Sequence, residues 1–73
     1  MKITDRAKRK LLSFGVREFA IVEKEDGYEI EVGEREGKSL KVEEFTVYYD
    51  EKLEERVLRA VLDFDCFFFI RFE

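Results

Sequence analysis

The side chains that most often carry catalysis are scarce in this chain. Its 73 residues include no histidine and a single cysteine, Cys66. General acid–base chemistry near neutral pH most often uses histidine, and a cysteine nucleophile needs a basic neighbour. Cys66 instead stands between Asp65 and Phe67. We therefore interpret Cys66 as a small, inert core residue.

Acidic residues form close pairs, at Glu29 and Glu31 and again at Asp63 and Asp65. Alternate strand positions and helix ends produce such pairs in ordinary folds, so we assign them no catalytic role. The sequence has no Gly-rich phosphate loop and no calcium-loop spacing. We therefore predict a protein that is not an enzyme, with no catalytic residue, no metal site and no cofactor.

Basic residues are concentrated at the start of the chain. Residues 1–10 carry a net charge of +4, whereas residues 11–73 carry −8. Arg6, Arg9 and Lys10 fall on one face of the helix expected there and are the candidates for contact with nucleic-acid phosphates. Against this, the acidic remainder repels a polyanion, and we expect no exposed aromatic platform among the basic groups. A solvated face is the favoured interpretation, ahead of a nucleic acid or an acidic protein partner.

The C-terminal segment is rich in aromatic residues. Residues 66–72 read Cys-Phe-Phe-Phe-Ile-Arg-Phe, an apolar run on both faces of a strand. Such a strand is prone to aggregation at an open edge, so we expect it to be central in a sheet or buried by a partner chain. Aromatic residues are also enriched at protein interfaces. We predict a protein interface formed by Phe67, Phe69, Arg71 and Phe72.

The elements that position these residues can be read from periodicity. Residues 4–14 are predicted to form a helix capped by Thr4, with an apolar stripe that includes Ala7, Leu11 and Phe14, and Gly15 stops it. Residues 16–24 and 28–33 are predicted strands joined by a three-residue turn, 25–27.

The apolar pattern of these two strands favours a register that pairs Val22 with Ile30 and Ala20 with Val32. Phe19 then lies on the opposite face, which must also be covered. We therefore expect the strand at residues 16–24 to lie inside the sheet.

The alternation of apolar residues that is typical of a strand resumes at Leu40 and Val42. It then shifts by one residue, because Phe45 and Val47 occupy odd positions. A change of parity requires either a bulge or a tight turn at residues 43–44. Two glutamates are poor turn residues, since neither favours a positive φ.

A second helix is predicted from a cap at Asp50 to about residue 64, because Leu53, Val57, Val61 and Phe64 recur at helical spacing. The expected order is therefore helix, three or four strands, helix and C-terminal strand. This order predicts one α+β domain over residues 1–73, with an antiparallel or mixed sheet of four to five short strands.

The opening Ile-Thr-Asp-Arg-Ala at residues 3–7 leads into a helix, and residues 42–53 are predicted to contain a bulge or turn, a strand and a helix-opening Asp in succession. These two segments resemble segments of the HesB-like family of A-type iron–sulfur carriers, in which a hairpin turn, a strand and a helix-opening Asp follow one another. The resemblance favours a turn at residues 43–44. Family members that handle clusters use three cysteines, whereas this chain has one. The resemblance therefore implies the fold without the cluster site, and a degenerate relative associated with iron–sulfur biogenesis.

Composition bounds the remaining possibilities. Charged residues make up 44% of the chain, and Asn and Gln are absent, which is typical of heat-adapted proteins and predicts a thermophilic source. No apolar run is long enough to cross a membrane, no signal segment is present, and a lone cysteine suits the reducing cytoplasm. A chain this short hides only about 60% of its unfolded surface, so association with a second copy is expected.

The sequence therefore predicts a non-enzymatic cytoplasmic protein that acts as a self-associating protein-interaction module. A homo-oligomer is the expected state, and an unidentified protein partner is the other partner considered. Nucleic-acid binding through the basic first helix is the alternative.

Overall fold

The computed structural model describes all 73 residues and has the predicted α+β class, with a helix before the C-terminal strand. Seven strands form two mixed sheets, where the sequence predicted one sheet of four to five strands. The elements are β1 (Lys2–Ile3), α1 (Asp5–Ser13), β2 (Glu18–Lys24), β3 (Gly27–Val32), β4 (Lys38–Val42), β5 (Phe45–Tyr49), the 3-10 turn η1 (Glu51–Leu53), α2 (Glu54–Leu58), β6 (Ala60–Asp65) and β7 (Phe67–Phe72).

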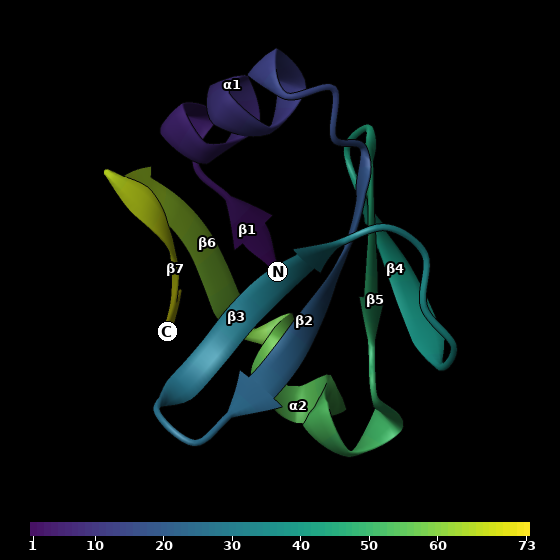
Figure 1. Ribbon diagram of the computed structural model, residues 1–73. Helices are drawn as coiled ribbons and strands as arrows, with labels where there is room; N and C mark the ends of the chain where they lie inside the picture. Colours follow the sequence, from purple (N-terminus) through teal and green to yellow (C-terminus); the bar gives the residue numbers. More distant parts are fainter.

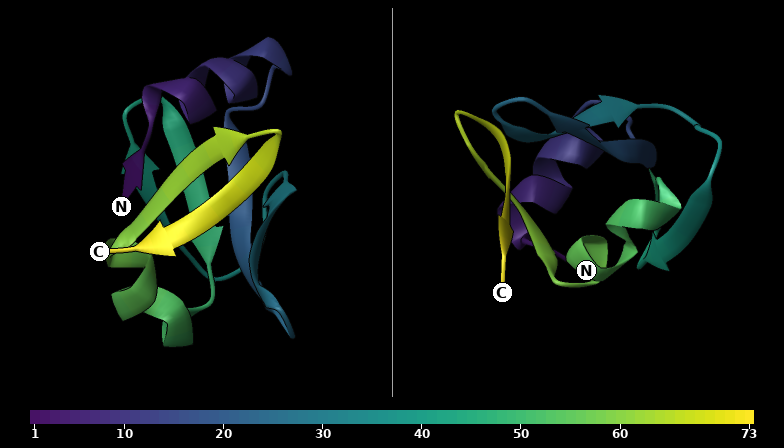
Figure 2. Two further views of the ribbon diagram at one scale, coloured as in Figure 1. Left: turned by 90° about the vertical axis from the view of Figure 1, so that its left-hand side faces the viewer. Right: turned by 90° about the horizontal axis from the view of Figure 1, so that it is seen from below.

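The larger sheet has the strand order β3-β2-β5-β4, and the smaller sheet has the order β1-β6-β7. The central pair β2 and β5 is parallel, as is the pair β1 and β6, while all other neighbours are antiparallel. The two sheets curve around a shared interior, with α1 over one end and α2 over the other (Figures 1 and 2). The place of β2 between β3 and β5 confirms that this strand lies inside a sheet.

The core is apolar throughout, since none of the 14 buried residues is charged. Phe19 and Phe45 from the larger sheet, Leu62 from the smaller sheet, Leu11 from α1 and Val57 from α2 are all fully buried. Apolar surface removed from water in this way stabilises a fold by about 25 cal/mol per Å². Both sheets and both helices therefore depend on one shared core.

Helix α1 forms as predicted. The Thr4 side chain accepts a hydrogen bond from the Ala7 N–H at 3.2 Å, which satisfies one of the free donors of the first turn. Ala7 and Leu11 are buried, and Gly15 follows the helix with a φ of 71°. The apolar stripe was predicted to include Phe14, but this residue is exposed.

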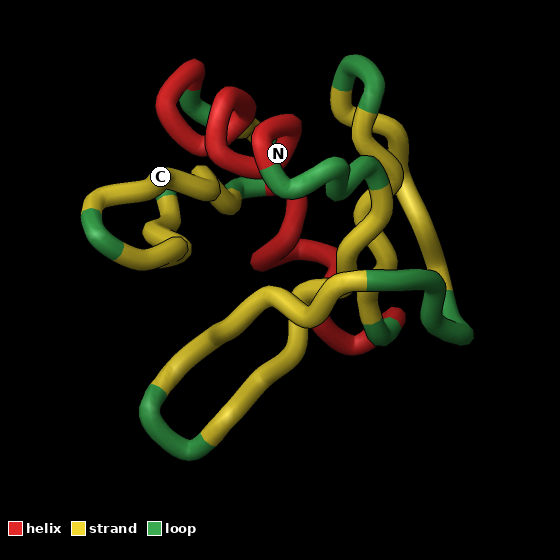
Figure 3. Tube along the Cα trace, turned by 45° about the horizontal axis from the view of Figure 1, so that its top comes forward, coloured by secondary structure: helices red, strands yellow, loops and turns green.

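The register predicted for the first hairpin is wrong. Ile21 pairs with Ile30 and Phe19 with Val32, so the loop has two residues, and Gly27 belongs to β3. The reason is side-chain volume: this register directs Phe19 and Ile21 into the core, whereas the predicted pairing matched smaller residues. The hairpin extends away from the body of the molecule (Figure 3).

The segment at residues 43–44 is a turn, as the family resemblance favoured, because Val42 pairs with Phe45. Glu43 adopts a φ of 55°, a backbone conformation that residues other than glycine rarely take. Its carboxylate pairs with the Lys8 ammonium group of α1, and Glu44 pairs with Arg17 at 2.8 Å. Two basic groups thus hold a turn whose residue types do not favour it.

The second helix is much shorter than predicted. It ends at Leu58, and residues 60–65 form the strand β6 in the middle of the smaller sheet. Ala60, Val61 and Leu62 are all buried, as suits a strand that is flanked by β1 and β7 on its two edges. Pairing with β1 and β7 therefore overrides the helical spacing of Val57, Val61 and Phe64.

Candidate functional site

The predicted protein interface lies on β7, which forms a hairpin with β6. This strand is at the edge of the smaller sheet, so it is not the central strand considered from the sequence. Its side chains alternate as predicted: Phe68 and Ile70 pack against the core, while Phe67 and Phe69 lie on the other face. Phe67 is 67% exposed, and Phe69 is half-buried.

The four predicted interface residues occupy two faces. Phe67, Phe69 and Arg71 share the outer face, where the rings of Phe67 and Phe69 meet edge to face with their centroids 6.2 Å apart. Phe72 points to the inner side and meets the ring of Tyr28 on β3, with centroids 5.1 Å apart. Phe72 therefore helps to join the two sheets, and the other three residues form the candidate surface.

The outer face of the β6–β7 hairpin lies at the surface of the molecule, with α1 beyond one end and α2 beyond the other (Figure 2). No other element lies in front of it in that view. Exposed apolar patches commonly mark interaction sites. We call the surface formed by Phe67, Phe69 and Arg71 the aromatic face.

Asp63 lies at the centre of the smaller sheet and connects its parts. Its carboxylate accepts hydrogen bonds from the Thr4 hydroxyl at 2.7 Å, from the Phe64 N–H at 2.8 Å and from the Arg71 guanidinium at 2.8 Å. These donors, Arg71 first and Thr4 second, lower the pKa of Asp63 from 3.8 to about 2. The carboxylate is therefore ionised at neutral pH, and its hydrogen bond orients the Arg71 guanidinium within the aromatic face.

The candidate nucleic-acid residues Arg6, Arg9 and Lys10 lie together on one face of α1, as predicted. They line a surface hollow of about 380 Å³ between the helix and the tip of the β6–β7 hairpin. Its other lining residues are Ser13, Phe64, Asp65 and Cys66. The tip contributes one carboxylate, since Asp65 lies 4.0 Å from the Arg6 guanidinium.

Aromatic side chains are interleaved with this basic cluster, contrary to the expectation from the sequence. The Lys10 ammonium nitrogen lies 5.2 Å from the ring centroid of Phe14 and 5.2 Å from that of Phe64. Phe14 is 65% exposed. Sequence reasoning missed this pair because Phe14 fits the apolar stripe of α1 and Phe64 was placed in a helix. The four-residue spacing of Lys10 and Phe14 is the signal that indicates their contact.

Cys66 is not a core residue, which corrects the prediction. It is exposed and connects Asp65 to Phe67 at the hairpin tip with a φ of 67°. The prediction failed because residues 66–72 were treated as one strand, whereas the strand begins at Phe67. The Cys66 thiol lies 4.0 Å from the Asp65 carboxylate.

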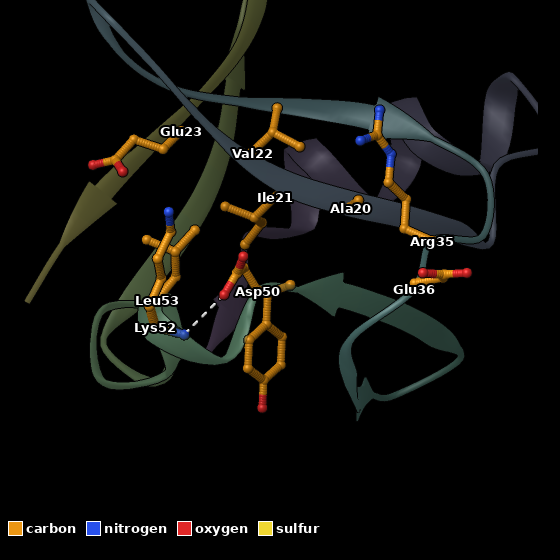
Figure 4. A pocket seen from close by; sticks show the side chains of 10 residues that line it. Ala20, Ile21, Val22, Glu23, Arg35, Glu36, Asp50, Lys52 and Leu53 are labelled. Atoms are coloured by element: carbon orange, nitrogen blue, oxygen red, sulfur yellow. Dashed lines mark hydrogen bonds between the residues drawn. The ribbon is translucent and has the colours of Figure 1, made fainter.

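A second hollow, of about 310 Å³, lies outside the larger sheet (Figure 4). Its lining comes from β2, from the connection of β3 to β4 and from η1, and includes Val22, Arg35, Glu36 and Lys52. The Asp50 side chain accepts a hydrogen bond from the Lys52 N–H at 3.1 Å at its edge. The charges on its rim are mixed, so the hollow has no preference for one sign of ligand. No pattern in the sequence indicated this hollow.

Comparison of the chain with protein-family models, with curated proteins and with solved structures finds no match. The resemblance to the HesB-like family therefore stays a prediction. None of the helices is both long and apolar enough to span a membrane. The aromatic face and the basic cluster are the two surfaces on which functional proposals can be built.

Proposed function

We propose that this chain is a non-enzymatic, cytoplasmic protein-interaction module that associates with a second copy of itself through the aromatic face. The observation that carries the proposal is the exposure of Phe67, at 67%, on a sheet face that no other element covers. Phe67 is not among the residues of the core or packed against it, so core packing does not explain this side chain. Burial of its ring by a partner would explain it.

The distribution of charge on the hairpin supports a second copy as the partner. Asp65 pairs with Phe67 at the tip of the hairpin, whereas Arg71 pairs with Val61 nearer to the base. The outer face thus runs from an acidic end at Asp65 to a basic end at Arg71, whose guanidinium also pairs with Asp63, and Phe67 and Phe69 lie between the two ends. A two-fold axis through the aromatic residues places the acidic end of each copy against the basic end of the other.

The geometry of Arg71 also favours association. Its hydrogen bond with Asp63 fixes the guanidinium on the outer face, so little side-chain freedom is left to lose when a partner binds. Aromatic residues and arginine are the side chains most enriched at the centres of protein interfaces. The aromatic face contains both types within one short strand.

Light scattering over a range of protein concentrations tests the proposal. We expect a dimer at high concentration, and a monomer when Phe67 and Phe69 are both replaced by serine. The matched control is Val32→Ser, because Val32 is 70% exposed on β3 and lies outside the aromatic face. The control is expected to dimerise as the unmodified protein does.

Two further variants distinguish association that depends on charge pairing across the two-fold axis from association that depends on apolar contact alone. Asp65→Lys should weaken the dimer, since it places like charges together across the two-fold axis, whereas Lys41→Glu on β4 should not. An unmodified protein that remains monomeric at millimolar concentration contradicts the proposal. So does a dimer that survives the loss of both phenylalanines.

A further inference from the structure

We propose that the basic cluster of Arg6, Arg9 and Lys10, together with the exposed ring of Phe14, binds single-stranded nucleic acid. The phosphates would lie against the three basic side chains, and an unstacked base would lie on the Phe14 ring. This surface is formed by α1 and the tip of the β6–β7 hairpin, and it includes none of the residues of the aromatic face. The inference therefore does not require self-association, although Asp65 at the hairpin tip borders both surfaces.

The charges of this cluster are largely free. Of the other basic residues near the N-terminus, Lys2 pairs with Glu73 and Lys8 pairs with Glu43 and Asp5. Arg9 and Lys10, in contrast, form no ion pair and donate no side-chain hydrogen bond.

Arg6 has only a 4.0 Å contact with Asp65 and a 3.4 Å hydrogen bond to the Phe64 carbonyl oxygen. These free positive charges lie on one helical face in a protein of net charge −4. An anionic ligand has this surface available to it without breaking a strong internal ion pair.

One of the two rings near Lys10 is anchored to the core. The Lys10 ammonium nitrogen lies 5.2 Å from the ring centroids of both Phe14 and Phe64. Phe64 in turn meets Phe68 edge to face, with centroids 4.8 Å apart, and Phe68 packs against the core cluster. Phe64 therefore holds its position before a ligand binds, whereas Phe14 is 65% exposed and presents its ring to solvent.

The combination of a free ring with basic groups favours single strands over duplexes. Bases in a duplex are stacked on each other and present only their edges, whereas an unpaired base can stack on an aromatic side chain. A hollow of about 380 Å³ between α1 and the hairpin tip is lined by the three basic residues and by Phe64. A short, acidic peptide offers charges for the three basic side chains but has no base for Phe14.

Fluorescence anisotropy with a labelled oligothymidylate of about 20 nucleotides tests the inference. We expect binding at low salt that weakens as salt rises. Each phosphate contact on a single strand contributes about −0.7 to the slope of log K against log salt, so three contacts predict a slope of about −2. No binding at about 20 mM salt overturns the inference.

The charge contribution is tested by Arg6→Glu, Arg9→Glu and Lys10→Glu in combination, which should abolish binding. The control combines Lys41→Glu, Lys52→Glu and Arg59→Glu. These three residues are exposed and outside the cluster, and their replacement makes the same change in net charge. The control should retain most of the affinity. Equal losses in the two proteins would show that only net charge matters and would overturn the site.

Two milder variants keep the test independent of folding. Phe14→Leu should weaken binding about 5- to 100-fold, the range for loss of one stacked base, with the salt slope unchanged. Asp65→Asn should strengthen binding, because it removes the one carboxylate that faces the hollow. An unchanged affinity in Phe14→Leu, or equal competition by polyglutamate, overturns the proposed stacking and hence the single-strand preference.

Discussion

The outer faces of the two sheets differ in how they are covered, although both sheets share one core. The connection of β3 to β4 folds across the outer face of the larger sheet, where Arg35 pairs with Glu31. Ala20 is 1% exposed beneath it. Burial, together with the nearby carboxylates of Glu18 and Glu34, raises the pKa of Tyr48 on the same face. The smaller sheet has no such cover over Phe67 and Phe69.

This difference separates aromatic residues that the fold requires from those that it does not. Phe19 and Phe45 are fully buried on the inner face of the larger sheet and form part of the core cluster. Phe67 makes its one aromatic contact with Phe69 and is otherwise open to solvent. Substitution of an inner aromatic residue should therefore lower the stability of the fold, whereas substitution of an outer one should weaken association.

The largest effect is expected from Phe19→Ala in the larger sheet. Removing a fully buried aromatic ring costs about 3 to 5 kcal/mol, because the transfer free energy is lost and a cavity remains. A domain of this size has a free energy of unfolding of about 4 to 11 kcal/mol, so the variant should lose a large part of its stability and melt at a clearly lower temperature. Urea denaturation followed by circular dichroism measures the change. A loss below about 1 kcal/mol would contradict the enclosure of Phe19.

A smaller effect is expected at Gly37, in the connection of β3 to β4 that covers the outer face of the larger sheet. We call this connection the cover. Gly37 has a φ of 113°, and a Cβ added there would lie 2.7 Å from the Tyr49 carbonyl oxygen. Gly37→Ala therefore combines backbone strain with a clash against main chain, and we expect a cost of about 2 kcal/mol or more.

Gly33→Ala is the matched control for this variant. Gly33 has nearly the same φ, 112°, but nothing lies within 4 Å of the added Cβ. The difference in unfolding free energy between the two variants isolates the clash. Because Gly37→Ala displaces the cover, it should also lower the pKa of Tyr48 towards its ordinary value, as measured by ultraviolet titration. Equal free energies of unfolding for the two variants would contradict the close contact between position 37 and the main chain of β5.

The sequence predicted the parts of the fold that depend on local signals. Thr4 caps α1 and Gly15 follows it, because capping and left-handed backbone need only neighbouring residues. The alternation of Phe67 and Phe68 on opposite faces of β7 was also predicted, since a strand of period two fixes it. Such signals do not depend on the rest of the chain.

The predictions that failed depend on contacts between distant residues. The spacing of Val57, Val61 and Phe64 suits a helix, but residues 60–65 form a strand because they pair with β1 and β7. The same holds for the basic cluster, whose position on α1 was predicted but whose contact with Phe64 was not. A hairpin tip more than 50 residues away completes that surface, and no local pattern contains this information.

Acid should affect the smaller sheet through Asp63. The pKa of this carboxyl is lowered from 3.8 in the unfolded chain to about 2 by the hydrogen bonds of Arg71 and Thr4. Its stabilising contribution is therefore fully present above about pH 4 and is lost as the pH falls through about 2. The unmodified protein should lose stability over this range, whereas Asp63→Asn should show a flatter profile with less stability at pH 7. Urea midpoints measured from pH 7 to pH 2 test this, and parallel profiles would contradict it.

The smallest effect on stability is expected from Phe67→Ser. This variant tests directly whether an exposed aromatic residue of the smaller sheet contributes to the fold. Phe67 is 67% exposed, so at low protein concentration the variant should unfold within about 0.5 kcal/mol of the unmodified protein. Phe68→Ser, one residue further along the same strand, removes a side chain that packs against the core and should cost several-fold more.

Concentration then distinguishes a functional role of Phe67 from a neutral one. A dimer that forms only from folded chains raises the melting temperature as protein concentration increases. The unmodified protein should show this rise and Phe67→Ser should not, whereas Phe68→Ser should melt at a lower temperature and still show it. A melting temperature independent of concentration in all three proteins would leave Phe67 without an interaction role. A large loss of stability in Phe67→Ser at low concentration would instead assign its ring to the fold.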